Sequence, residues 1–238
     1  MDLVSTTQAE RHASSDEFDE HGRHGHQASL ADGLDFVNTL EFSKGVPRDD
    51  LTSAAVAVAW FQHHALLHGE TAAQLVADVA HDDAAADKLL QRVQKTRGAL
   101  RDLLVAAVER RTPSDAALRE VNRALRAQYL YELVPAADGV SLDHRHEGDP
   151  IAGALARLSE AIARELTQDD KERLRICAND ECRWVFRDNS PAGRRKWCDM
   201  SSCGNRAKAA RHRERQKHRA DVAPVAELGH SAESAPAN

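Results

Sequence analysis

The first 176 residues of this chain contain no cysteine, and all four cysteines fall between Cys177 and Cys203. Aromatic residues are also scarce, at 4% of 238 residues, while alanine supplies much of the 42% hydrophobic content. Because alanine favours helices, we expect a mainly α fold with an ordinary core. The chain has no run of about 18 apolar residues, which excludes a transmembrane helix. Its acidic start lacks the apolar stretch of a signal peptide, so we expect a cytoplasmic protein.

Charge is divided unevenly along the chain. The formal net charge is −6, but residues 171–219 hold 15 Lys/Arg against 6 Asp/Glu, a formal +9, so the rest carries −15. An acidic body joined to a basic end is typical of proteins that bind nucleic acid through the basic end.

Composition and periodicity divide the chain into four segments. Residues 1–28 form an acidic, histidine-rich tail that cannot bury enough surface to fold, and residues 221–238 are also expected to be disordered. Residues 30–167 form a helical domain whose longest helical pattern covers 82–111. Ser114 and Asp149, the latter followed by Pro150, are predicted helix N-caps. One β-hairpin is expected around the AADG turn at 136–139. Residues 172–219 hold the cysteines and a basic helix.

The helical segment offers no catalytic motif. It has no glycine-rich phosphate loop and no nucleophile elbow. His64 and His68 are four residues apart, but HALLH lacks the glutamate of a zincin, and an exposed helix face explains the pair better than a metal site does. We therefore do not expect an enzyme. A pocket with converging titratable side chains would favour one.

The four cysteines have the spacing of a tetrahedral metal site. Four residues separate Cys177 from Cys182 and Cys198 from Cys203, and fifteen lie between the pairs. Two tight turns can each aim two sulfurs at one ion, which favours one zinc ion per chain. An iron–sulfur cluster is an alternative because it also uses four thiolates. Disulfides are rare in a reducing compartment, which disfavours a disulfide pair.

The sequence around the cysteines predicts a small module with a basic arm. In the insert RWVFRDNSPAGRRKW, we expect WVF and RRKW to pair as a hairpin, with Trp184, Phe186 and Trp197 beside the metal. A helix is expected after Cys203, with Glu214 as its single acid up to Arg219. A merely solvated helix is the alternative, although solvated helices usually mix charges. The candidate nucleic-acid contacts are Arg194, Arg195, Lys196, Arg206, Lys208, Arg211, Arg213 and Arg215.

Residues 177–215, CANDECRWVFRDNSPAGRRKWCDMSSCGNRAKAARHRER, resemble the CGNR zinc finger. The family is named for the residues that stand here at Cys203, Gly204, Asn205 and Arg206, and the likeness extends to Asp188, Ser190 and Trp197. The segment LADGLDFVNTLEF at 30–42 resembles the ABATE domain, which is usually found upstream of this finger and is labelled a stress-induced transcription regulator. The resemblance implies a bacterial DNA-binding regulator.

The expected fold is therefore a helical N-terminal domain with a small β-hairpin, followed by a treble-clef-like zinc finger that ends in a basic helix. We expect a zinc-dependent transcriptional regulator that binds duplex DNA, with a helical domain that senses a small-molecule effector or contacts a protein partner. An RNA-binding or ribosome-associated zinc protein is the alternative, because phosphate contacts do not distinguish the two polymers.

Two expectations concern local structure and stability. Gly204 is expected to permit a tight turn after the last thiolate, and Asn205 to tie that turn by hydrogen bonds. Because a small module depends on its metal for folding, loss of zinc is expected to unfold the module. The helicity of the N-terminal domain is expected to stay largely intact.

Overall fold

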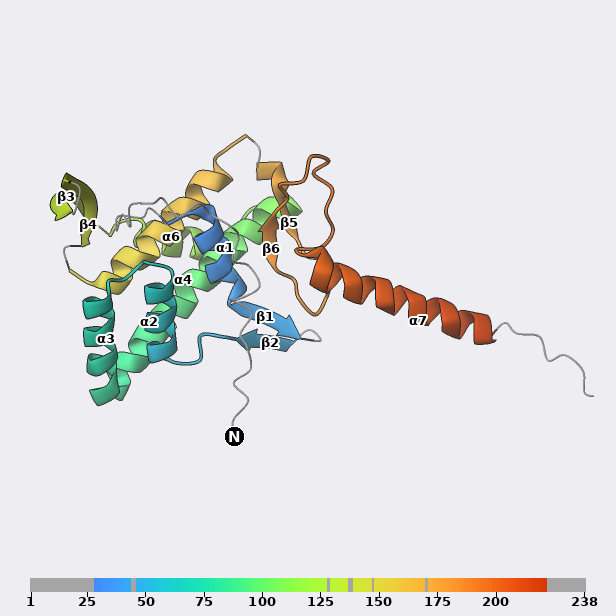
Figure 1. Ribbon diagram of the computed structural model, residues 1–238, viewed down its shortest axis with the longest axis horizontal. Coiled ribbons are helices and arrows are strands. Elements are labelled where there is room, and N and C mark those ends of the chain that lie inside the picture. The colour runs from blue at the N-terminus through green and yellow to red at the C-terminus, as the bar shows by residue number, and fades with distance from the viewer. Residues whose placement is uncertain are drawn as a thin grey trace, which may run out of the picture.

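A computed structural model describes residues 28–43, 46–127, 129–136, 139–146, 148–169 and 171–221. Helices dominate these residues, which confirms the mainly α class (Figure 1). The helices are α1 (Leu30–Asn38), α2 (Ala54–His63), α3 (Gly69–His81), α4 (Asp83–Glu109), α5 (Asp115–Ala124), α6 (Pro150–Leu166) and α7 (Asn205–Asp221). Among the described residues, no helix is both long and apolar enough to cross a membrane.

Helix α4 is the centre of the helical region. It fills most of the predicted 82–111 span, begins where the Asp82 side chain accepts a hydrogen bond from the N–H of Ala85, and ends at a left-handed Arg110. Leu89, Val93 and Leu100 are among its buried residues, and they follow the helical spacing that the sequence showed. The helix contacts α1, α2, α3, α5 and α6, so this apolar stripe organises the core.

The N-caps predicted at Ser114 and Asp149 are confirmed. The Ser114 hydroxyl accepts from the N–H of Ala117 at the start of α5. The Asp149 carboxylate accepts from the N–H groups of Ile151 and Ala152 at the start of α6, where Pro150 takes the first helical position. These side chains satisfy backbone donors that a helix leaves free, which is why the local sequence was enough to place both helix starts.

Within the described ranges, six strands form three separate two-stranded antiparallel sheets. The hairpin of β3 (Tyr129–Ala136) and β4 (Gly139–His146) confirms the predicted one. The hairpin of β1 (Leu40–Ser43) and β2 (Val46–Asp49) was not predicted, because both strands have only four residues and the second, VPRD, includes Pro47 and two charged residues. Its Asp49 carboxylate is held by the buried Arg97 of α4.

The third hairpin corrects a prediction about the cysteine module. The strand β6 (Val185–Arg187) pairs with β5 (Leu174–Ile176), which precedes the first cysteine, and residues 194–197 form no strand. Val185 and Leu174 are apolar and bury against the helical core, whereas the RRK sequence offers no apolar side chain for that purpose. The short 3₁₀ helix η2 (Lys171–Arg173) precedes β5, and the π-helical segment η3 (Met200–Gly204) lies within the module.

The cysteine module and the helical region share one core. Leu174 and Val185 belong to the same apolar cluster as the buried residues of α1, α4 and α6. Asn38 of α1 makes two buried hydrogen bonds with Val185: its Nδ2 donates to the carbonyl oxygen, and its Oδ1 accepts from the N–H, both at 2.9 Å. Helix α7 extends away from this body as an arm (Figure 1).

Candidate metal centre and nucleic-acid interface

Four thiols converge where the module meets α7. Cys177 follows β5, Cys182 precedes β6, and Cys203 lies in η3. All four sulfurs lie within 4.8 Å of one another, and Cys198 Sγ is 3.7 Å from Cys182 Sγ and 3.8 Å from Cys203 Sγ. A tetrahedral ion with metal–sulfur bonds of ~2.3 Å has sulfur–sulfur edges of about 3.8 Å. The cysteines are free, and the separations far exceed the ~2.05 Å of a disulfide. The cluster therefore fits one tetrahedral metal ion.

Three of the thiols influence one another's ionisation. Thiol hydrogen bonds from Cys182 and Cys198 hold the pKa of Cys177 far below its usual value. The thiolate at Cys177 in turn raises the pKa of Cys182 and of Cys198. One anionic sulfur thus disfavours the next, and a divalent ion removes this conflict because it binds all four as thiolates. A set of four thiolates suits zinc, as the CGNR-like pattern implied.

Backbone and side-chain donors surround the sulfurs. The N–H groups of Cys198 and Asn179 donate to Cys177, and the N–H of Trp184 donates to Cys182. The Asn179 side-chain amide donates to Cys203 Sγ at 3.5 Å. Such donors orient metal ligands and spread their negative charge. The expected aromatic residues also pack here, with Phe186 buried and Trp184 and Trp197 partly buried against the cluster.

Asp188 shapes the loop between β6 and the second cysteine pair. Its buried carboxylate accepts from the hydroxyl of Ser190 at 2.6 Å, from the N–H of Ser190 at 3.0 Å and from the N–H of Arg195 at 2.7 Å. The Ser190 hydroxyl, followed by these backbone donors, lowers the pKa of Asp188 to about 2. The guanidinium of Arg173 donates to the Ser190 carbonyl at 2.7 Å, and that of Arg175 to the Gly193 carbonyl at 2.9 Å. Asp188 and Ser190 therefore hold the loop in place and are not metal ligands.

Gly204 has a different role from the one expected. The backbone there is helical, so the residue does not permit an unusual turn. A Cβ at this position would instead lie 2.9 Å from Met200 Sδ and 3.4 Å from Trp197 Cδ1. The glycine lets these side chains approach the backbone closely. Asn205 does tie the segment, because its Nδ2 donates to the Ser201 carbonyl at 2.9 Å.

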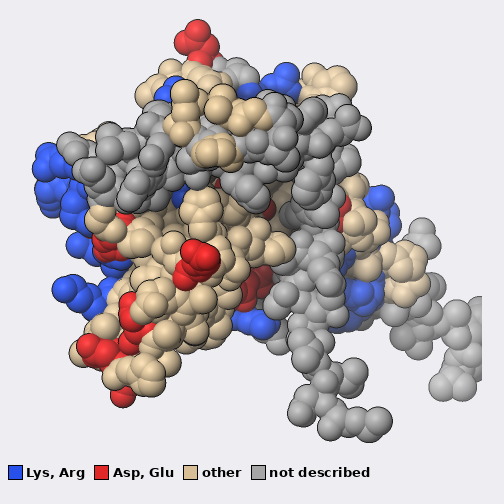
Figure 2. All heavy atoms as spheres, turned by 60° about the vertical axis from the view of Figure 1, so that its left-hand side comes forward, with Lys and Arg blue, Asp and Glu red and all other residues tan. Residues whose placement is uncertain are grey.

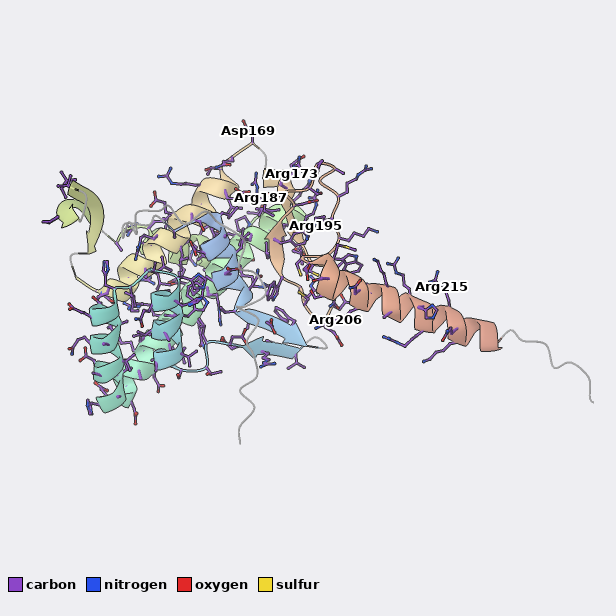
Figure 3. All side chains as sticks on the ribbon, viewed as in Figure 1. Asp169, Arg173, Arg187, Arg195, Arg206 and Arg215 are labelled. Atoms are coloured by element: carbon purple, nitrogen blue, oxygen red, sulfur yellow. The ribbon has the colours of Figure 1, made fainter. Side chains whose placement is uncertain are left out.

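The structure exposes all the candidate nucleic-acid contacts except Arg195. Arg206 lies at the base of α7 and Arg215 towards its far end (Figure 3), and the basic side chains of α7 from Arg206 to Lys217 are exposed. Arg194 and Lys196 are also exposed. Arg195 is half-buried, donates to the Cys198 carbonyl at 2.5 Å and lies over the Phe186 ring, 5.5 Å from its centroid. Its side chain therefore supports the loop.

Acidic side chains occupy the other end of the molecule. Figure 2 shows them on the face that α3 and the start of α4 form. The exposed acids of these two segments are Glu70, Asp78, Asp82, Asp83 and Asp87. The charge asymmetry of the sequence thus becomes a separation in space, with the acidic face away from the basic arm.

The structure also shows residues whose importance the sequence did not indicate. Asn38, Arg101 and Glu165 come from three helices and all bind the backbone or side chains of residues 183–187. The sequence feature that could have indicated such residues is a polar residue inside an apolar pattern, such as Arg101 directly after Leu100. The histidine pair was misinterpreted, since α2 ends at His63 and His64 is largely buried, stacked on Trp60 and 3.1 Å from Asp32.

Two families match the chain in comparisons with known proteins. Residues 30–170 match ABATE, described as a putative stress-induced transcription regulator, and residues 173–216 match the CGNR zinc finger. No curated protein matches the chain. The two matches agree with the resemblance inferred from LADGLDFVNTLEF and from the cysteine module.

Proposed function

Since the chain belongs to the ABATE family of regulators and carries a CGNR zinc finger, we propose that it binds duplex DNA through α7 and the adjoining loop. The observation that carries the proposal is the exposed α7, whose charged residues from Arg206 to Lys217 are basic except for Glu214. Cys203, one of the four clustered cysteines, lies two residues before this helix, so the metal site fixes the base of the arm.

The composition of α7 suits a phosphate-binding helix. Its exposed side chains cannot form a protein core, and its 17 residues span about 25 Å at 1.5 Å per residue. A helix of this kind fits the ~12 Å wide major groove of B-DNA. Arg206, Arg213 and Lys217 lie along one side, and Lys208, Arg211 and Arg215 along the other. Both sides cannot enter one groove, so several of these cations contact phosphates, and Arg206, at the fixed base, is the best-placed base reader.

We assign the regulatory role to residues 30–167 and DNA binding to residues 172–219. Support for a sensor or protein-contact role comes from the way α1, α4 and α6 hold residues 183–187, because a change in the packing of these helices would reach the finger directly. An RNA target is the second candidate, since the same cations bind both polymers.

Replacement of Arg211 and Arg215 together by alanine tests the proposal. The variant should bind specific and random duplexes more weakly, and the slope of log affinity against log salt should flatten by about one to two units. The matched control replaces Lys88 and Arg119, two exposed cations of the helical region, by alanine, and should bind as the parent does. Unchanged DNA binding by the α7 variant would refute the proposal. If structured RNA competes for the protein better than duplex DNA does, the target is RNA and not DNA.

A further inference from the structure

Arg101 extends from the helical region to the residue that follows Cys182. It lies in α4, and its Nη2 donates to the carbonyl oxygen of Arg183 at 2.7 Å. Its guanidinium also lies over the ring of Phe42, 5.0 Å from the centroid. Arg183 directly follows Cys182 and has a left-handed backbone, with φ of 56°. These contacts fix the cation beside the residue that follows a metal-ligand thiol.

Few nearby groups offset the positive charge of Arg101. Burial lowers the pKa of Arg101, and the cations of Arg183 and Arg97 lower it further, whereas the nearby Cys182 raises it. Nη1 is buried and has no hydrogen-bond partner among the described residues. An arginine cannot shed its proton to escape such a site. A half-buried cation with an unused donor therefore lies beside the backbone of the residue that follows Cys182, one of the thiols that become anionic when they bind a metal.

We propose that Arg101 is a positioning residue of the metal site, which offsets the negative charge of the metal-bound thiolates and so raises the metal affinity of the chain. A divalent ion with four thiolates keeps two negative charges, and a buried net charge is unfavourable unless a counter-charge lies nearby. Arg101 supplies one positive charge without ligating the metal. Because it belongs to α4, the zinc affinity of the finger depends on the helical region.

The test measures zinc affinity of the full chain by competition with a chromophoric chelator. Arg101→Gln keeps a polar side chain but removes the charge, and should weaken zinc binding about 10- to 100-fold, the usual effect of losing an outer-shell partner. Arg101→Lys keeps the charge and should stay within a few-fold of the parent. Lys88→Gln, an exposed cation on the same helix, serves as the matched control and should not change the affinity.

Two further measurements separate charge from packing. Cobalt substitution should give the absorption of a tetrahedral four-thiolate site in every variant. Urea unfolding with and without zinc should show that Arg101→Gln destabilises the zinc-bound chain more than the zinc-free chain. Equal destabilisation of both, equal weakening by Gln and Lys, or unchanged zinc affinity would each overturn the proposal. None of these measurements involves nucleic acid, so their outcome is independent of the proposed DNA binding.

Discussion

Gly193 and Gly98 differ in their backbone conformation and in the space around them. Gly193 has a φ of 58°, and a Cβ there would lie 2.8 Å from Nη1 of Arg173, the same nitrogen that donates to the Ser190 carbonyl. Gly98 lies in the middle of α4 and is exposed, and a Cβ at this position would have no atom within 4 Å. The first position needs glycine for its backbone and its surroundings, whereas at the second the glycine only adds to the entropy of the unfolded chain.

Alanine at these two positions should therefore act in opposite directions. Gly193→Ala should lower the free energy of unfolding by about 1–2 kcal/mol, because the left-handed backbone is unfavourable for a residue with a Cβ. Gly98→Ala should raise it by up to about 1 kcal/mol, because alanine favours the helix. Urea unfolding of the zinc-bound full chain measures both. A stabilising Gly193→Ala would contradict the loop geometry.

At the scale of elements, the joint between α4 and α5 depends on one buried carboxylate. Glu120 of α5 pairs with Arg123 and accepts from the Thr96 hydroxyl at 2.9 Å, and its other oxygen lies 3.1 Å from Lys95 Nζ. The hydrogen bond from Arg123 lowers the pKa of Glu120 to about 2, although burial acts in the opposite direction. Hydrogen bonds from Thr96 and Lys95 also lower this pKa. The ionised form is therefore favoured in the folded chain.

The stability contributed by Glu120 should depend on pH. A carboxylate whose folded pKa lies below its unfolded value stabilises fully above the unfolded value, ~4.3, and less as pH falls towards the folded value. Glu120→Gln should thus be less stable than the parent at pH 7, with a difference that shrinks between about pH 4.5 and pH 2. Parallel urea unfolding of both chains measures this difference, and any acid release of zinc affects both alike. A constant difference over this range would contradict the role of the charge.

At the scale of the whole molecule, the finger is part of the helical core. Leu174 and Val185 are buried among residues of the helices, and the Asn38 side chain satisfies both backbone groups of Val185. A metal held by the four cysteines would therefore stabilise a hairpin on which α1, α4 and α6 pack. The sequence led us to expect that metal loss spares the helical region, whereas this packing leads us to predict that the two regions are coupled.

Removal of zinc should consequently lower the thermal midpoint of the helical region as well as unfold the finger. Ligands that bind only the folded state stabilise every element that unfolds with them. The helical signal in circular dichroism, recorded with and without a chelator, measures the shift. Cys198→Ser should show the lowered midpoint without chelator and little further response to it. An identical helical transition in the presence and absence of zinc would show that the two regions unfold independently.

The sequence by itself determined the features that depend on neighbouring residues. The extent of α4, the Ser114 and Asp149 caps and the β3–β4 hairpin follow from local spacing and capping chemistry, and the paired cysteines follow from the geometry of a tetrahedral ion. The four metal ligands and the basic helix could be named for the same reason, since each is a contiguous pattern. The structural role of Arg195 could not be predicted in this way, because it depends on the positions of the Phe186 ring and the Cys198 carbonyl in the fold.

Tertiary structure decided how these parts meet. Asn38 and Val185 are 147 residues apart, and Arg101 and Arg183 are 82 apart, so no local pattern could pair them. The choice of β5 over residues 194–197 as the partner of β6 was likewise a matter of burial, because β5 offers Leu174 and Ile176 to the core of the helices. A strand takes the partner that lets its apolar face be buried, and that face exists only once the helices have assembled.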